Sequence, residues 1–315
     1  MFTTASLPVA DPMIWRMFMR HDAIIIGGSF AGLSAAMYIA RARRSVCIID
    51  TGSPRNRFAA HSHGFFAQDG SAPGAMLATA RAQVAAYPTA AFIAEAAISA
   101  AREPDGFSVK LATGAVLESA RLVLAFGIAD ELPAIPGLVA RWGQSVLHCP
   151  YCHGFEFSGQ RLGVLHLSPR SIHQALLIAE WGPTTLYLNG AAAPDDAALA
   201  QLQQHGVAIE PAPVRALHGE GAQLAAIELG DGRTAGVDAL YLGPRTHLNS
   251  EIAQQLGCEL DEGVFGSIIR TDDTKMTTVS GVYAAGDITR SAHNVTWASA
   301  DGVTAGMAVH RSLVF

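Results

Sequence analysis

The chain has 315 residues, of which half are hydrophobic and 15% are charged, and its net charge is −6. This length suffices for two domains with large buried cores, and the lack of a basic stripe argues against a nucleic-acid partner. No apolar run reaches the roughly 18 residues of a membrane span, and the charged first 20 residues lack the apolar core of a signal peptide. We therefore expect a cytoplasmic protein without a membrane segment, in which residues 1–20 form a flexible arm.

The first predicted elements are two apolar strands on either side of a helix whose apolar residues share one face. This order predicts a βαβ unit at the start of the chain. The strands are expected at 21–26 and 45–49, and the helix at 31–43.

The turn between the first strand and the helix resembles a dinucleotide fingerprint. Its residues Gly27, Ser29 and Gly32 stand at the glycine positions of G-x-G-x-x-G, with a serine in place of the second glycine. Asp50 follows the second strand, where an acid can bind ribose hydroxyls. A small residue at the second position still allows a pyrophosphate to approach the N-terminus of the helix. The expected nucleotide-binding residues are therefore Gly27, Ser29, Phe30, Ala31, Gly32 and Asp50.

An antiparallel meander is predicted next, with Asp105-Gly106 as a hairpin turn. It follows an irregular segment and a helix, and a further apolar strand then ends at Gly127. Pro133 and Pro136 interrupt regular structure and predict a crossover into another domain. The irregular segment is expected at 51–74, the helix at 75–86, the meander strands at 93–102, 107–112 and 116–119, and the further strand at 121–126.

A second strand–helix–strand pattern begins near residue 161, and the chain is expected to cross back at 246–249. The two patterns predict an α/β fold with two Rossmann-like nucleotide-binding domains of the three-layer ββα type, the second inserted in the first. The first domain comprises 1–131 and 249–315, and the inserted domain comprises 132–248. A final strand at 282–285 carries Gly286 and Asp287 at its end, before a final helix at 298–313.

The most specific motif is Cys149-Pro150-Tyr151-Cys152-His153. Two thiols three residues apart can close a disulfide with a tunable potential, and the adjacent histidine can take a proton from a thiol. Cys149, Cys152 and His153 are thus the candidate catalytic residues. Two other readings stay open: a zinc site, although no second C-x-x-C supplies further ligands, and a purely structural cysteine pair. We expect no metal.

These motifs and their order resemble the low-molecular-weight thioredoxin reductase family of flavoproteins over residues 22–315. The resemblance implies FAD in the first domain, an NAD(P)-type inserted domain, and a homodimer. It implies that Cys152 is the sulfur near the flavin and that Cys149 is the exposed interchange thiol. It also implies flavin contacts by Arg57, His63, Gly127, Gly286, Asp287 and the backbone of Val295.

Two departures separate the chain from an ordinary thioredoxin reductase. His153 stands where such reductases commonly have an acid, and the Cys-Pro-Tyr-Cys-His run is similar to the dithiol oxidases that close disulfides in gliotoxin, holomycin and disulfide depsipeptides. In the second turn, His166, Ser168 and Ser171 replace the residues that bind a dinucleotide, so NAD(P) binding is doubtful, although Asn189 can still bond a ribose.

The leading hypothesis is therefore an FAD-dependent enzyme that oxidises a small-molecule dithiol to an intramolecular disulfide through Cys149 and Cys152. Oxygen or NADP would be the electron acceptor. The first alternative is an NADPH-dependent reductase of protein disulfides. The second is a flavin-binding redox sensor that does not turn over.

Overall fold

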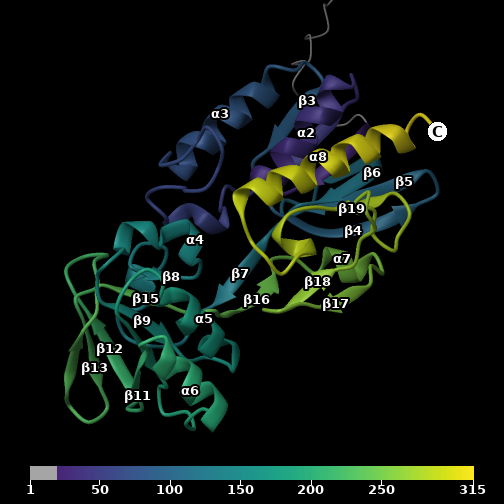
Figure 1. Ribbon diagram of the computed structural model, residues 1–315. Coiled ribbons are helices and arrows are strands. Elements are labelled where there is room, and N and C mark those ends of the chain that lie inside the picture. Colours follow the sequence, from purple (N-terminus) through teal and green to yellow (C-terminus); the bar gives the residue numbers. More distant parts are fainter. Residues whose placement is uncertain (1–19) are drawn as a thin grey trace, which may run out of the picture. The chain divides into compact units, whose positions relative to one another are not determined.

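The structure, a computed structural model, describes residues 20–315, so residues 1–19 of the predicted arm lie outside the described part of the chain. The chain divides into two compact units (Figure 1). Unit 1 comprises the described residues up to 54 together with 77–128 and 248–315, and unit 2 comprises 55–76 and 129–247.

Unit 1 is built on a seven-stranded sheet with the order β3-β2-β1-β6-β5-β4, in which β19 pairs with β6. The strands β1, β2, β3, β6 and β19 pair in parallel, and β4, β5 and β6 form the predicted antiparallel meander. The strands are β1 (His21–Ile26), β2 (Val46–Ile49), β3 (Ala90–Ile93), β4 (Ala97–Glu103), β5 (Gly106–Leu111), β6 (Val116–Leu124) and β19 (Val282–Ala284).

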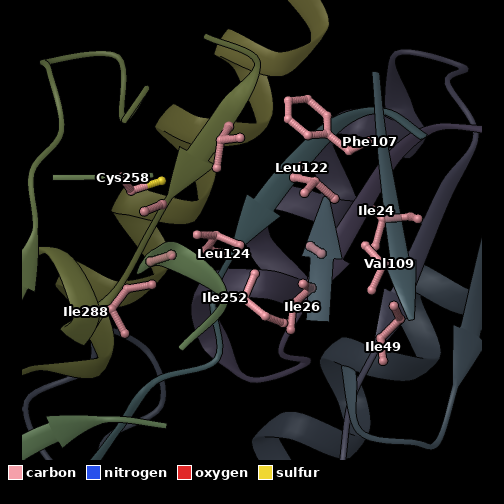
Figure 2. Close-up of a cluster of buried hydrophobic side chains, with 14 of the residues drawn as sticks. Ile24, Ile26, Ile49, Phe107, Val109, Leu122, Leu124, Ile252, Cys258 and Ile288 are labelled. Carbon is pink, nitrogen blue, oxygen red and sulfur yellow. The ribbon is translucent and has the colours of Figure 1, made fainter. Parts of the chain in front are cut away.

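Each face of this sheet carries its own apolar core, because successive side chains of a strand point to opposite faces. Ile24 and Ile26 belong to the cluster of Figure 2, where Ile252 and Leu124 pack beside them. Ala23 and Ile25 belong to the opposite cluster, which includes residues of two long helices. The helices of the unit are α2 (Phe30–Arg41), α3 (Pro73–Ala85), α7 (Ile252–Gln255) and α8 (Val295–Ser312), and a small hairpin joins β17 (Leu260–Glu262) to β18 (Ser267–Ile269).

One predicted break in this sheet is wrong. The sequence analysis separated a meander strand at 116–119 from an apolar strand at 121–126, whereas β6 runs through both. The first half of β6 pairs with β5, and β19 takes the place of β5 beside the second half. The change of partner alters the burial pattern without interrupting the strand.

Unit 2 has a five-stranded parallel sheet with the order β11-β10-β9-β15-β8, a three-stranded antiparallel sheet β12-β13-β14, and short helices. Together the two units confirm the predicted α/β class with Rossmann-like sheets. The elements are β8 (Val146–Leu147), α4 (Pro150–His153), β9 (Leu162–Leu165), α5 (Arg170–Ile178), β10 (Thr184–Tyr187), α6 (Asp196–Gln204), β11 (Ala208–Glu210), β12 (Val214–His218), β13 (Ala226–Leu229), β14 (Thr234–Gly236) and β15 (Ala239–Tyr241). The crossover strands β7 (Ile128–Glu131) and β16 (Arg245–Leu248) pair with each other.

The segment 55–76 differs from the predicted domain division, which placed it in the first domain. In the structure it belongs to unit 2 because its contacts lie there. The Arg55 guanidinium donates two hydrogen bonds to the Asp130 carboxylate, at 2.9 and 2.5 Å. Phe58 lies against the backbone of Gly143, where a Cβ atom would come within 2.8 Å of the phenylalanine.

Candidate active site

The turn between β1 and α2 has the shape that a dinucleotide requires. Gly27 has φ +110°, and a Cβ atom there would lie 2.1 Å from the Ala125 carbonyl oxygen. A Cβ atom at Gly32 would lie 1.9 Å from the Gly27 carbonyl oxygen, so α2 packs closely on the turn. Glycine is therefore required at both positions, as the fingerprint predicts.

The N-terminus of α2 can bind an anion. Ser29 is the N-cap residue, and its side chain makes no capping hydrogen bond. The first turn, which begins with Phe30 and Ala31, contains no acidic residue. The N–H groups of this turn are thus oriented to bind phosphate oxygens, and the helix dipole adds to their attraction.

The Gly27–Gly32 turn and the Gly286 turn, both predicted to bind FAD, lie side by side in unit 1, although they are far apart in the sequence. Gly286 has φ +87°, and a Cβ atom there would lie 3.0 Å from the Ala31 Cβ atom. On α8, a Cβ atom at Gly302 would lie 2.1 Å from the Ala31 carbonyl oxygen. Asp287 begins the turn after Gly286, and Val295 is the first residue of α8. This cradle of small residues beside a helix N-terminus fits the diphosphate and ribityl portion of FAD.

Asp50 has a partner that the sequence analysis missed. Its carboxylate is 16% exposed and accepts a hydrogen bond of 2.6 Å from the Arg81 guanidinium of α3. The guanidinium also lies 4.7 Å from the ring centre of Phe92. Gly28 lies against the other side of the carboxylate, since a Cβ atom there would be 2.8 Å from it. These contacts hold the acid where a ribose is expected.

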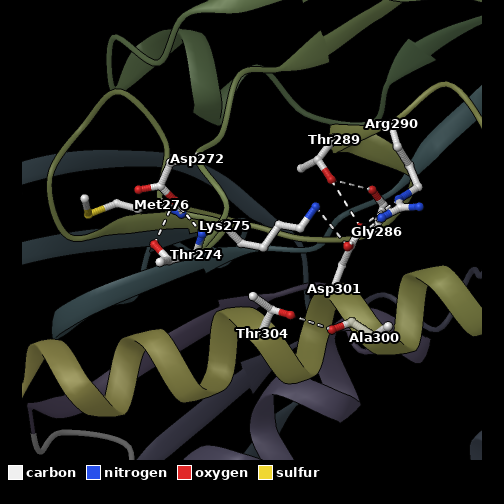
Figure 3. Close-up of polar contacts among 10 residues, drawn as sticks. All are labelled: Asp272, Thr274, Lys275, Met276, Gly286, Thr289, Arg290, Ala300, Asp301 and Thr304. Atoms are coloured by element: carbon white, nitrogen blue, oxygen red, sulfur yellow. Dashed lines mark hydrogen bonds and ion pairs between the residues drawn. The ribbon is translucent and has the colours of Figure 1, made fainter.

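A second acid that the sequence analysis missed supports the Gly286 turn (Figure 3). Asp301 of α8 is buried and pairs with Lys275 at 2.8 Å and Arg290 at 2.7 Å. The Thr289 hydroxyl donates to the Gly286 carbonyl oxygen at 3.0 Å and lies 3.4 Å from the same carboxylate. One carboxylate therefore ties α8 to the turn that carries the flavin motif.

Replacing Asp301 with asparagine is expected to lower the free energy of unfolding of the flavin-loaded protein by about 3 kcal/mol, because two largely buried cations lose their counter-charge. Chemical denaturation followed by far-ultraviolet circular dichroism measures the change. The matched control is Asp231→Asn, which removes a carboxylate that is 45% exposed beside Arg233 and should leave stability nearly unchanged. Equal effects of the two substitutions would contradict the structural role of Asp301.

Gly127 closes β6 in the left-handed region, with φ +70°. Its carbonyl oxygen accepts a hydrogen bond from the Asn249 backbone N–H at 3.1 Å, and the Asn249 side chain donates to the Phe126 carbonyl oxygen at 3.1 Å. Gly127 thus joins the outgoing chain to the returning chain. Its predicted contact with FAD stays a prediction.

The cysteine motif lies in unit 2, where β8 leads directly into α4. Cys149 is the N-cap residue, and Pro150 occupies the first position of the helix, where its fixed φ fits and no N–H is needed. Cys149 and Cys152 form a disulfide, with 5.3 Å between their Cα atoms. Cys47 and Cys258 are buried as free thiols in unit 1.

His153 ends α4 and is half-buried. Burial lowers the pKa of its imidazole; Glu156 acts in the opposite direction, and His63 lowers it further. The Tyr241 hydroxyl donates to the His153 carbonyl oxygen at 3.3 Å, which helps to hold this end of the helix. A histidine with a lowered pKa stays neutral at pH 7 and is able to accept a proton from a thiol.

Two residues expected to contact the flavin, Arg57 and His63, belong to the segment 55–76 of unit 2. The Arg57 guanidinium stacks on Phe58 at 4.2 Å from the ring centre. The two ring nitrogens of His63 lie 3.5 Å from Asp69 and 3.3 Å from Glu156, and its ring centre is 6.2 Å from that of His153. His63 therefore lies beside the cysteine motif, and a contact of either residue with FAD stays a prediction.

In the second nucleotide turn, between β9 and α5, the backbone N–H groups that would bind a phosphate are already hydrogen-bonded to a side chain of the turn. The Ser171 hydroxyl is buried and accepts hydrogen bonds from the backbone N–H groups of Leu167 at 3.0 Å and Ser168 at 3.4 Å. Pro169 has no N–H to offer. The Asn189 side chain accepts a hydrogen bond from the Val214 N–H at 2.9 Å, so its carbonyl oxygen already has a structural partner.

Within residues 20–315, no group of three or more His, Cys, Asp or Glu side chains is arranged to hold a metal ion. Across the same part of the chain, no helix has the length and apolar character needed to cross a bilayer.

Comparisons with known proteins agree with this geometry. A family model described as pyridine nucleotide-disulphide oxidoreductase matches residues 21–165 and 188–302. Thioredoxin reductase sirT of Leptosphaeria maculans is 31% identical and covers 92% of this chain and 93% of its own length. Thioredoxin reductase tcpT of Claviceps purpurea is 32% identical, with 93% and 94% covered.

Solved structures show the same likeness. An oxidoreductase from Agrobacterium tumefaciens is 43% identical and superposes with a TM-score of 0.90 over 94% of this chain and 99% of that chain. HlmI is 38% identical and superposes with a TM-score of 0.89 over 94% of this chain and 93% of its own.

Proposed function

The chain belongs to the pyridine nucleotide-disulphide oxidoreductase family, and we propose that within it this enzyme oxidises a small-molecule dithiol to an intramolecular disulfide. The family implies the use of FAD, and the glycine cradle of Gly27, Gly32 and Gly286 fits that cofactor. The bound flavin supplies a two-electron acceptor for thiol chemistry.

In the proposed reaction the substrate first exchanges with the enzyme disulfide. One substrate thiolate attacks Cys149, which breaks the Cys149–Cys152 bond and forms a mixed disulfide. The second substrate thiol then attacks its own sulfur in the mixed disulfide and releases the cyclic product. His153 accepts a thiol proton, and re-formation of the Cys149–Cys152 disulfide, with Cys152 as the sulfur that would lie nearer the flavin, would supply the electron pair to the cofactor. Oxygen is the terminal acceptor and becomes hydrogen peroxide.

One observation carries the choice of a dithiol rather than a nicotinamide as the electron source. The Ser171 hydroxyl accepts hydrogen bonds from the two backbone N–H groups of the turn, at 3.0 and 3.4 Å, which a pyrophosphate would otherwise need. His166 and Pro169 add bulk to the same turn. The proposed mechanism then needs no nicotinamide, because electrons from the substrate dithiol enter through Cys149 and Cys152.

The runner-up is a thioredoxin reductase that passes electrons from NADPH to a protein disulfide. The names of the relatives sirT and tcpT favour it. This alternative requires the β9–α5 turn to open so that its two N–H groups are released from Ser171. It also requires the loop after β10 to hold the 2′-phosphate of NADPH, although that loop contains no arginine.

Anaerobic stopped-flow absorbance of the flavin distinguishes these functions. Dithiothreitol is expected to bleach the flavin of the purified enzyme at least ten times faster than equimolar NADPH, and admitted oxygen should restore the absorbance with formation of hydrogen peroxide. Rapid bleaching by NADPH with a slow response to dithiothreitol would instead establish the reductase. Stoichiometric bleaching by the dithiol without turnover in oxygen would indicate a redox sensor.

A further inference from the structure

We propose that His63 is a proton-relay residue: it takes up at Nε2, by way of Glu156, the proton that leaves His153, and it releases a proton from Nδ1 to Asp69 and so to solvent. The inference rests on the proposed dithiol oxidation. It assigns a role to a histidine that the sequence analysis placed only among the flavin contacts.

The reaction requires a route for one proton. Oxidation of a dithiol to a cyclic disulfide breaks two S–H bonds, forms one S–S bond, and releases two electrons and two protons. The electron pair passes to the flavin with one proton, and the second proton leaves the protein. His153 is half-buried, so a proton that it accepts needs a neighbouring group through which to leave.

His63 is the titratable ring beside His153, and each of its nitrogens faces a carboxylate. The two imidazole centres are 6.2 Å apart with their planes nearly perpendicular, at 88°. The His63 Nε2 atom lies 3.3 Å from Glu156, and the Nδ1 atom lies 3.5 Å from Asp69. An imidazole can accept a proton at one nitrogen and release one from the other.

The two carboxylates connect this ring to water. Glu156 follows α4 with a side chain that is 38% exposed, and the side chain of Asp69 is 72% exposed. The hydrogen bond from the Gly64 N–H, with a smaller contribution from His63, lowers the pKa of Asp69, so this acid stays ionised at neutral pH. The chain of groups thus runs from a half-buried histidine to two exposed carboxyl groups.

The loop that carries His63 is held in place by its own backbone. The Ser62 N–H donates to the Ser71 carbonyl oxygen at 2.8 Å, and the Gly70 N–H donates back to the Ser62 carbonyl oxygen at 2.9 Å. The Gly64 N–H donates to Asp69 at 2.8 Å. These bonds close the loop on both sides of His63 and fix the backbone from which its ring projects.

The titratable groups that act on His153 are Glu156, in the short turn after α4, and His63, in the segment 55–76. Glu156 raises the pKa of His153 and His63 lowers it, while burial is the largest cause of its lowered value. The Tyr241 hydroxyl donates a hydrogen bond to the carbonyl oxygen of His153. Because the pKa of His153 is lowered, the ring gives up an accepted proton readily, which suits a group that must be reset in every cycle.

The test compares His63→Ala with the matched control His61→Gln. His61 lies in the same loop, its ring centre 6.3 Å from that of His63, but its Nδ1 atom bonds the Gly70 carbonyl oxygen at 3.0 Å instead of a carboxylate. Flavin content is measured first. Anaerobic reduction of the flavin by dithiothreitol is then followed by stopped flow between pH 5.5 and 8.5, with and without added imidazole.

A separate readout monitors the cysteine pair without the flavin reaction. Iodoacetamide alkylation of the reduced protein against pH reports the ionisation of Cys149 and Cys152, because these two residues are only partly buried whereas Cys47 and Cys258 are buried. A relay residue acts on the transfer of the proton, so the alkylation profile of His63→Ala should match that of the wild type.

The expected result is a flavin reduction that is about 10- to 100-fold slower in His63→Ala, the lower part of the range for proton-transfer groups. Imidazole should restore most of the rate, Glu156→Gln should slow it to a similar extent because it removes the carboxylate on Nε2, and His61→Gln should stay within about twofold of the wild type. An unchanged rate, a loss without rescue by imidazole, or a loss of flavin from His63→Ala would overturn the relay. A wild-type flavin that dithiothreitol does not reduce would instead remove the proposed function itself.

Discussion

Cys149→Ser is expected to abolish dithiol oxidation while the protein keeps its flavin. The serine hydroxyl cannot form the mixed disulfide, and Cys152 alone cannot accept two electrons from the substrate. The turnover number should fall on the order of 10³-fold or more, the scale on which removal of a covalent nucleophile acts in other enzymes. Oxygen consumption with a saturating dithiol measures the loss, and visible absorbance measures the flavin. Because the FAD cradle lies in unit 1 and the disulfide in unit 2, flavin content should match that of the wild type.

The control for this substitution is Cys258→Ser. Cys258 is a buried free thiol of unit 1, and its sulfur donates a hydrogen bond to the Thr277 hydroxyl at 3.4 Å, a contact that serine can keep. Turnover by this variant should stay within about twofold of the wild type. If Cys149→Ser still oxidised the dithiol at the wild-type rate, the mixed-disulfide mechanism would be refuted.

Gly32→Val is expected to yield a protein without flavin. A Cβ atom at this position would lie 1.9 Å from the Gly27 carbonyl oxygen and 3.3 Å from the Ile25 side chain, so α2 would have to move off the turn. Overpacking of this kind costs about 1–3 kcal/mol or more in stability. The shift also displaces the N–H groups that would bind the diphosphate, and FAD affinity should fall at least about 100-fold. Fluorescence titration of the apoprotein with FAD measures the loss.

Gly74→Ala is the matched control for the glycine substitution. Gly74 lies in α3 with a helical φ, and nothing lies within 4 Å of the position that its Cβ atom would take. Alanine has a higher helix propensity than glycine, so stability should stay equal or rise by up to about 1 kcal/mol. Flavin binding by Gly32→Val at the wild-type level would show that the diphosphate does not bind at this turn.

The parts of the fold with a local pattern could be predicted from the sequence. The strand–turn–helix around Gly27 and Gly32, the Cys149–Cys152 pair and the final helix follow from periodicity and short motifs, and the structure contains all of them. The sequence also indicates that the second turn lacks glycine. It does not indicate that the hydroxyl of Ser171 occupies the N–H groups of that turn, because this depends on a side-chain rotamer.

The remaining errors come from contacts between residues that are far apart in the chain. The segment 55–76 packs on unit 2 through pairs such as Arg55–Asp130, which are 75 positions apart and have no local signature. Asp301 has the sequence context of an ordinary helical acid, and only the fold brings Lys275 and Arg290 to it. The hairpin of β17 and β18 was missed because its strands have only three residues each and β17 carries two charged side chains.

The packing of Gly286 and Gly302 against Ala31 links ligand affinity to folding. The same backbone that would bind the diphosphate forms the contact surface between α2 and α8, so a chain that unfolds here also loses its cofactor. The free energy of FAD binding therefore adds to the free energy of unfolding of unit 1. Above the dissociation constant, every tenfold rise in free FAD adds about 1.4 kcal/mol to the stability of unit 1. We therefore expect that, where more free flavin is available, a newly made chain spends less time unfolded and is degraded more slowly by proteases.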